Sequence, residues 1–265
     1  MKLSVIIPCF NHGNYIQEAI DSVLSLEDDE IEIIIVDDGS SEEYTKRKLE
    51  SLIQKGFKVI RHENKGLGYT RNQGIMHARG KYILPLDADN KLAIKHFDTA
   101  IHLLENNSCD IVYGNPIFFG EEIESRKFNV KDFDGIDLFF GNYIDACAIF
   151  KKEVWQQLGG YDEEMPYNGN EDWEFWVHAF IKGFRFYHLD EQMYYYRIIA
   201  NSMLANTQEK DKGNLNYQYI TKKHSYQIVK IFNQEYAYNK TYRSDYLTPL
   251  KSSFKYFKLY IKSFL

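Results

Sequence analysis

The sequence predicts an α/β fold: a Rossmann-like parallel sheet, then a mixed α+β half and a helical C-terminal tail. Strand and helix patterns alternate over the first ninety residues, short strand patterns prevail after them, and the chain turns polar and rich in Tyr and Lys near residue 206. We therefore divide the chain into residues 1–90, 91–205 and 206–265. Its 265 residues, 44% hydrophobic and 26% charged, suffice to bury a core without disulfides or a structural metal.

The first part of the chain has the βαβαβαβ order. Strands are expected over residues 3–8, 31–36, 57–60 and 82–86. Helices are expected over residues 14–26, 41–55 and 67–79, with Gly56 and Gly80 as candidate helix ends. Residues 31–36, IEIIIV, have the continuous β-branched character of a strand that is buried on both faces. Right-handed crossovers turn this order into a parallel sheet with helices on both sides.

The second part of the chain has shorter patterns. Helices are expected over 92–106, from near Glu171 and around 216–233. Short strands are expected over 110–113, 117–119, 146–150, 184–188 and 193–198. We interpret residues 91–205 as a mixed region that decorates the sheet, because no Pro- or Gly-rich linker separates them from it.

Composition excludes several classes of protein. No apolar run approaches the roughly eighteen residues of a membrane-spanning helix, and Pro8 ends the N-terminal apolar run too early for a signal peptide. The scattered Cys9, Cys109 and Cys147 exclude a disulfide framework or zinc ribbon and fit a reduced, cytoplasmic chain. The net charge of -6 argues against a nucleic-acid partner.

Polar residues follow the strands of the predicted sheet, where the carboxyl ends of parallel strands line one crevice. Asp87-Ala88-Asp89 follows the fourth strand and can bind a divalent cation through oxygen while leaving positions for phosphate, although the same residues suit a turn. Asp38 follows the second strand and can accept a hydrogen bond from a base or ribose. The following Ser40 or Ser41, with Glu43, approximates a helix capping box.

Three further segments carry charge. The loop that contains Lys65, Gly66 and Arg71 offers positive potential at a helix start, although its glycines also suit a plain turn. Glu171 and Asp172 open a helix, where acids suit the helix dipole or supply a general base. Arg197 ends an aromatic strand and pairs with either a diphosphate or a surface carboxylate.

Together these motifs resemble glycosyltransferase family 2 over roughly residues 1–205. The motifs are VIIPCFN at 5–11, VDDGS at 36–40, NKGLGYTRNQG at 64–74, GKYILPLDADN at 80–90, LGGYDEE at 158–164 and NEDWEFW at 170–176. The resemblance implies a GT-A fold, with a donor half at 1–90 and an acceptor half at 91–205. It also implies a nucleotide-sugar donor, with UDP expected, and inversion at the anomeric carbon.

The resemblance also implies roles for individual residues. Those on the nucleotide and donor side are Pro8, Phe10, Asn11, Asp38, Gly66, Arg71, Asp87, Ala88, Asp89 and Arg197. Asp89, with Asp87, would hold Mn²⁺ or Mg²⁺, and Asp172 would be the general base. Glu171 and Trp173 would shape the acceptor side. Relatives often place a histidine shortly after the arginine, whereas Ile198-Ile199-Ala200 stand here.

The expected acceptor is a glycan, a lipid-linked molecule or a cell-surface polysaccharide. A sugar nucleotidyltransferase is the weaker enzymatic alternative, because PCFNHGNY replaces its glycine-rich loop. A non-catalytic relative that binds a sugar or a nucleotide is a second alternative. Residues 240–265 carry six basic residues and one acid, and residues 250–265 form a basic amphipathic pattern that either lies on an anionic membrane or packs on the domain.

Overall fold

The computed structural model describes residues 2–93, 97–121, 127–199 and 210–262. It contains two compact units, Met1–Ile220 and Thr221–Leu265. The boundary expected at 205/206 lies outside the described residues.

The first unit is built on a mixed sheet that has eight strands within the described residues, in the order β3-β2-β1-β4-β7-β6-β8-β5. The strands are β1 (Leu3–Cys9), β2 (Ile31–Asp37), β3 (Lys58–Arg61), β4 (Tyr82–Pro85), β5 (Lys91–Leu92), β6 (Ile111–Gly120), β7 (Ile149–Lys151) and β8 (Phe186–Ile198). β1 pairs in parallel with both β2 and β4, and β2 with β3, so the predicted parallel sheet is confirmed. Chain order reverses between β1 and β4, which in open α/β sheets is where ligands bind.

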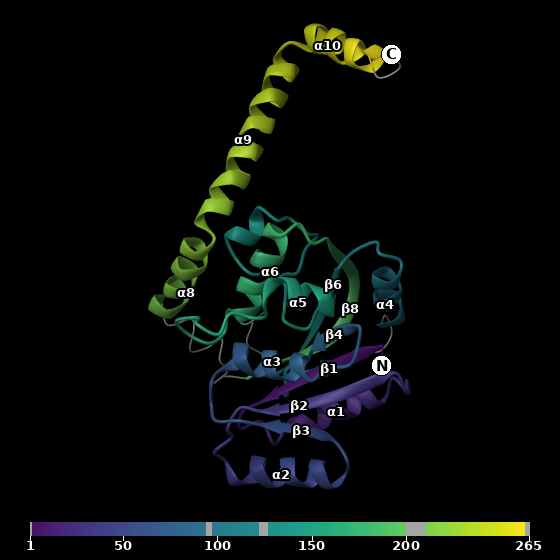
Figure 1. Ribbon diagram of the computed structural model, residues 1–265, viewed down its shortest axis with the longest axis vertical. Helices are drawn as coiled ribbons and strands as arrows, with labels where there is room; N and C mark the ends of the chain where they lie inside the picture. The colour runs from purple at the N-terminus through teal and green to yellow at the C-terminus, as the bar shows by residue number, and fades with distance from the viewer. Residues whose placement is uncertain (1, 94–96, 122–126, 200–209, 263–265) are drawn as a thin grey trace. The chain divides into compact units, whose positions relative to one another are not determined.

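Helices cover both faces of the parallel strands, as the sequence predicts. α1 (Ile16–Leu24) and α2 (Glu43–Gln54) pack with Val5 and Ile7 on one face. α3 (Leu67–Met76) lies on the other face, where a Cβ at Gly74 would overlap Ile6. Figure 1 shows α3 and α2 on opposite sides of β1 and β2. This alternation explains why β1 is buried along its whole length.

The second part of the sheet differs from the expectation of many short strands. The stretches 110–113 and 117–119 both contribute to one strand, β6, which begins at Ile111, and residues 184–188 and 193–198 contribute to one strand, β8. β6 and β8 pair in parallel with register shifts at Gly114/Asn115 and Asn115/Pro116. The irregularity breaks the alternation of apolar residues, so the pattern alone suggests separate strands.

The helices of this part also differ in detail from the expectation. The helix predicted over 92–106 is the shorter α4 (Phe97–Glu105), and it is preceded by β5. α5 (Lys152–Leu158) was not predicted, whereas the helix predicted from Glu171 is confirmed as α6 (Glu171–Ile181). A short 3-10 helix, η3 (Asp137–Phe139), precedes the segment that leads into β7.

The C-terminal helices are α8 (Lys210–Lys223), α9 (Ser225–Leu247) and α10 (Pro249–Lys262). Within the second unit, α9 and α10 contact each other. Of the helices among the described residues, none has the length and apolar character that crossing a membrane requires.

Candidate active site

A cleft of about 800 Å³ opens where the carboxyl ends of β1 and β4 meet the start of α6. Ten of the predicted site residues line it: Pro8, Phe10, Asp38, Arg71, Asp87, Ala88, Asp89, Glu171, Asp172 and Arg197. Asn11, Gly66 and Trp173 do not line it. Parallel-strand ends thus bring together residues that are up to 189 positions apart in the chain, from Pro8 to Arg197.

One side of the cleft, which we call the β4 wall, consists of Asp87, Ala88 and Asp89 with Arg71 and Arg197. Asp87 accepts a hydrogen bond at 2.9 Å from Nη2 of Arg71. Its backbone carbonyl also accepts the N–H of Asn90, so the three residues form a turn as well as a carboxylate pair. The two interpretations of this motif are therefore compatible.

Asp89 is the more deeply buried carboxylate of this wall. Burial raises the pKa of Asp89 to about 6; His12 and Arg197 favour its charged form, and the neighbouring charge of Asp87 opposes it. A carboxylate in this position is stabilised by any further positive charge that enters the cleft.

Arg197 is held firmly beside Asp89. Its Nε donates to the carbonyl of Asp89 at 2.8 Å, and its Nη2 lies 3.0 Å from the carboxylate of Glu18. Its guanidinium also lies between the rings of Tyr15 and Phe119. It therefore has a carboxylate partner and also lines the cleft.

Arg71 is almost completely buried in α3, with 2% of its surface exposed, yet it lines the cleft. Nη2 bonds Asp87, but Nε and Nη1 have no hydrogen-bond partner among the described residues. Because buried donors without partners are costly, this arginine is suited to an anionic or oxygen-rich ligand.

Asp38 organises the glycine-containing loop. Its two carboxylate oxygens accept the backbone N–H groups of Lys65 and Gly66 at 2.7 and 3.1 Å. Gly66 has φ 89°, and a Cβ there would lie 2.6 Å from Oδ1 of Asn168, so only glycine fits. Asp38 thus both fixes the loop before α3 and lines the cleft.

Asn11 lies outside the cleft and holds the start of α2. Its Oδ1 accepts the N–H groups of Ser41 and Glu42 at 2.9 and 3.0 Å. The expected capping box is wrong: Ser40 instead accepts the N–H of Asn11 through its hydroxyl. Asn11, two residues after β1, therefore supplies the cap that the sequence attributes to the serines.

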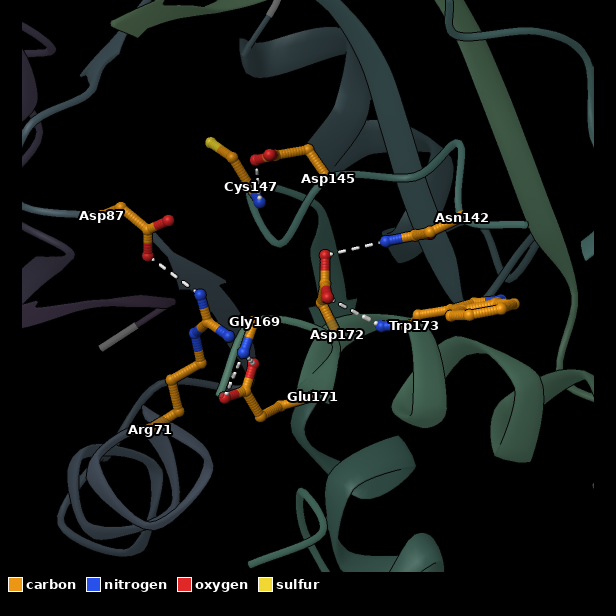
Figure 2. Close-up of polar contacts among 9 residues, drawn as sticks. All are labelled: Arg71, Asp87, Asn142, Asp145, Cys147, Gly169, Glu171, Asp172 and Trp173. Atoms are coloured by element: carbon orange, nitrogen blue, oxygen red, sulfur yellow. Dashed lines mark hydrogen bonds and ion pairs between the residues drawn. The ribbon is translucent and has the colours of Figure 1, made fainter. Parts of the chain in front are cut away.

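The opposite side of the cleft, which we call the α6 wall, consists of Asp145, Glu171 and Asp172. Figure 2 shows these side chains around Arg71 and Asp87. Asp172 accepts hydrogen bonds from Nδ2 of Asn142 at 2.9 Å and from the N–H of Trp173 at 2.8 Å. Glu171 accepts the N–H of Gly169 with both oxygens.

Burial dominates the ionisation of this wall. It raises the pKa of Asp172 to about 7, against the attraction of Arg71 and with added repulsion from Glu171. It also raises the pKa of Glu171, which Arg71 and the N–H groups of its own residue and of Gly169 oppose. A carboxyl with a pKa near 7 can exchange a proton at neutral pH, as a general base requires.

Trp173 packs next to the α6 wall and does not line the cleft. It is 6% exposed, its Nε1 donates to the carbonyl of Leu138 at 2.7 Å, and its ring stacks on Tyr217. It therefore joins α6 to η3. These contacts explain why Trp173 is buried, and its role on the acceptor side stays a prediction.

Sequence reasoning missed Asn142 and Asp145. Both lie between η3 and β7, in a stretch without helix or strand periodicity. Asp145 lines the cleft, its Oδ1 accepts the N–H of Cys147 at 2.8 Å, and burial raises its pKa to about 8. An acidic residue directly before the apolar run ACAIF was the available signal.

Comparison with known proteins identifies a family. The model described as glycosyl transferase family 2 matches residues 4–159. An uncharacterized glycosyltransferase of Methanocaldococcus jannaschii is 26% identical over an alignment of 243 positions, and the match covers 87% of this chain and 81% of that protein. Glycosyltransferase GlyG of Streptococcus pneumoniae is 28% identical over 68% of this chain, but the match spans only 54% of its own length.

Solved structures share the fold. TarS residues 1–349 from S. aureus, in complex with UDP-GlcNAc, match 77% of this chain and 61% of that one with a TM-score of 0.62 at 22% identity. The same TarS fragment in complex with UDP gives a TM-score of 0.60 at 23% identity, over 76% of this chain and 61% of that one. The fold of this chain is accordingly the GT-A fold of glycosyltransferases.

Proposed function

Because the chain belongs to glycosyl transferase family 2, we propose that it transfers a sugar from a UDP-sugar to a hydroxyl group of a glycan, lipid-linked or cell-surface polysaccharide acceptor, with inversion. One observation carries the proposal: a single cleft has paired carboxylates and two arginines on the β4 wall and a carboxyl with a pKa near 7 on the α6 wall. In this proposal residues 1–90 bind the donor, residues 91–205 bind the acceptor, and the tail is a separate extension.

The α6 wall would handle the proton. Asn142 and the N–H of Trp173 hold the Asp172 carboxylate, which takes the proton of the acceptor hydroxyl. The acceptor oxygen then forms a bond to C1 of the sugar while the bond from C1 to the phosphate oxygen breaks. The nucleoside diphosphate leaves from the opposite face, so the configuration at C1 inverts.

The β4 wall would hold the diphosphate. The unpartnered Nε and Nη1 of Arg71 and the guanidinium of Arg197 supply positive charge beside Asp87 and Asp89. Asp87 and Asp89 fit Mn²⁺ or Mg²⁺, because both offer hard oxygen ligands and burial destabilises the charged form of Asp89. When bound, the ion would neutralise charge on the leaving diphosphate. Ile199 lines the cleft without offering a ligand.

Calorimetric titration tests this function directly. UDP, GDP and dTDP are each titrated into the full chain with and without Mn²⁺. We expect one nucleotide, UDP, to bind, and to bind much more tightly with Mn²⁺. If a folded protein binds none of the three under either condition, the proposed function is contradicted and only the fold remains.

We also propose that α10 contacts an anionic membrane at its cytoplasmic face. Lys251, Lys255 and Lys258 are exposed, and so is 60% of Phe257. Residues 263–265 of the predicted 250–265 contact lie outside the described residues. The three cysteines are free, as in a reducing compartment.

Co-sedimentation with liposomes tests the membrane contact. The full chain should bind vesicles of phosphatidylcholine with phosphatidylserine more than vesicles of phosphatidylcholine alone. Replacing Lys251, Lys255 and Lys258 by Gln should remove this difference. Undiminished binding of the triple variant to anionic vesicles would contradict the proposal.

A further inference from the structure

Asp145 is a half-buried carboxylate to which the proposed proton transfer and diphosphate binding assign no role. It lines the cleft from the segment between η3 and β7. Oδ1 accepts the N–H of Cys147, and no basic side chain among the described residues forms an ion pair with it. A partly desolvated carboxylate that lacks a cationic partner is destabilising, so its presence in the cleft needs an explanation.

Asp145 lies between the residues proposed to bind the diphosphate and the residue proposed to take the proton. Asp87, Asp145 and Asp172 all line this cleft, and the charges of Asp87 and Asp172 help to raise the pKa of Asp145. Figure 2 shows Asp87, Asp145 and Asp172 directed toward a common region beside Arg71. If the proposed function holds, the transferred sugar occupies this region, because its C1 must face the diphosphate on one side and the acceptor hydroxyl on the other.

A second observation in the same region points to a ligand. Arg71 is 2% exposed and lines the cleft, and its Nε and Nη1 lack partners among the described residues. In the proposed function these donors bind the diphosphate, so the carboxylate of Asp145 lies beside the part of the donor that follows the phosphates. A sugar hydroxyl group can donate a hydrogen bond to this carboxylate, whereas an acceptor-only phosphate cannot.

We propose that Asp145 is a specificity-determining residue that accepts hydrogen bonds from hydroxyl groups of the transferred sugar. This assignment rests on the proposed function and deepens it. Asn142, three residues earlier, holds the base Asp172. The segment between η3 and β7 therefore both positions the base and contacts the sugar. A substitution in this segment affects the choice of donor and the transfer of the proton together.

Asp145→Asn tests the assignment with little change in shape. The amide oxygen of Asn can still accept the N–H of Cys147, but its NH₂ group cannot accept from a hydroxyl. Because the substitution keeps the shape of the side chain and replaces a carboxyl that has no ion pair among the described residues, the variant should fold, which its melting temperature checks. Asp145→Ser is the second variant, and Asp172→Asn is the matched control on the same wall.

The affinities of UDP, UDP-glucose, UDP-galactose and UDP-GlcNAc are measured by calorimetry in Mn²⁺. For Asp145→Asn we expect UDP to bind within about twofold of the wild type, while the UDP-sugar that the wild type prefers loses roughly tenfold or more. Asp172→Asn should keep the wild-type ratio between UDP and that UDP-sugar.

Two results would overturn the assignment. An equal loss for UDP and UDP-sugars would make Asp145 a ligand of the metal or the diphosphate, and unchanged binding of all three UDP-sugars would remove it from the sugar site. If the wild type does not bind UDP in Mn²⁺, the proposed function itself fails, and the role of Asp145 falls with it.

Discussion

The two walls of the cleft differ in the groups that face their carboxylates. On the β4 wall, Asp87 bonds a guanidinium, and Asp89 lies beside His12 and Arg197. On the α6 wall, the hydrogen bonds to Asp145, Glu171 and Asp172 come from amide N–H groups. Arg71 also favours the ionised forms of Glu171 and Asp172, but its hydrogen bond goes to Asp87, and burial outweighs its attraction on the α6 wall. The β4 wall is thus suited to hold charge, and the α6 wall to exchange a proton near neutral pH.

The largest effect is expected at the proposed base. Asp172→Asn removes the proton acceptor but keeps the shape of the side chain, so kcat should fall by about 10²- to 10⁴-fold. The affinity for UDP in Mn²⁺ should hardly change, since the β4 wall is intact. Release of UDP from a UDP-sugar measures kcat, and calorimetry measures the affinity.

Asp98→Asn is the matched control, because Asp98 is an exposed aspartate on α4. It should keep full activity. A kcat of Asp172→Asn that stays within about threefold of the wild type would assign the base to another group and remove the proposed division between the walls.

A smaller effect, and one of a different kind, is expected on the β4 wall. Asp89→Asn removes a proposed ligand of the divalent ion, so the affinity for UDP in Mn²⁺ should fall by at least roughly tenfold. Binding without metal should be unchanged or slightly stronger, because a negative charge near the diphosphate is gone. Calorimetry with and without Mn²⁺ separates the contribution of the ion from the affinity for UDP alone. An undiminished effect of Mn²⁺ in Asp89→Asn would show that the ion is held elsewhere.

The next prediction concerns the group that holds the base. Asn142→Ala deletes the donor to Oδ2 of Asp172, so the carboxylate loses a stabilising hydrogen bond and its pKa rises further above about 7. At pH 7 kcat should fall by roughly fivefold, and the rise of kcat with pH should move up by about one unit. Recovery of activity at higher pH distinguishes this effect from a structural loss; a uniformly reduced profile would contradict it.

The β4 wall could be predicted from the sequence, because parallel strands carry their end residues to one edge. Asp87 and Asp89 follow β4, Asp38 follows β2, and regular strand and helix periods located both. Arg71 lies on the helix that the intervening crossover requires. Local sequence patterns, together with the known topology of parallel α/β sheets, therefore sufficed to predict the β4 wall.

Most of the α6 wall's support could not be predicted in this way. Asn142 and Asp145 lie in a segment without periodicity, and Asn142 meets Asp172 across thirty residues. A role for Trp173 was expected from the family resemblance alone, and its hydrogen bond to the carbonyl of Leu138 joins residues 35 positions apart in the chain. These placements depend on tertiary contacts that no local pattern encodes.

The smallest predicted effect is the pH dependence of stability in the absence of metal and nucleotide. Burial raises the pKa values of Asp89, Asp172 and Asp145 to about 6, 7 and 8, whereas unfolded aspartates titrate near about 4. Between about pH 4 and pH 8 the folded protein therefore binds more protons than the unfolded chain, and stability must fall as the pH rises. The melting temperature should drop by roughly 5 °C or more over this range.

Two variants show how much each wall contributes to the decrease of stability with rising pH. Asp89→Asn should flatten the fall below about pH 6, where Asp89 loses its proton, and Asp145→Asn should flatten it further, up to about pH 8. Mn²⁺ with UDP should raise the melting temperature most at high pH, because the bound cation compensates carboxylates that are ionised there. A wild-type melting temperature that rises from pH 4 to pH 8 would mean that both walls already have enough positive charge, and the contrast between them would be lost.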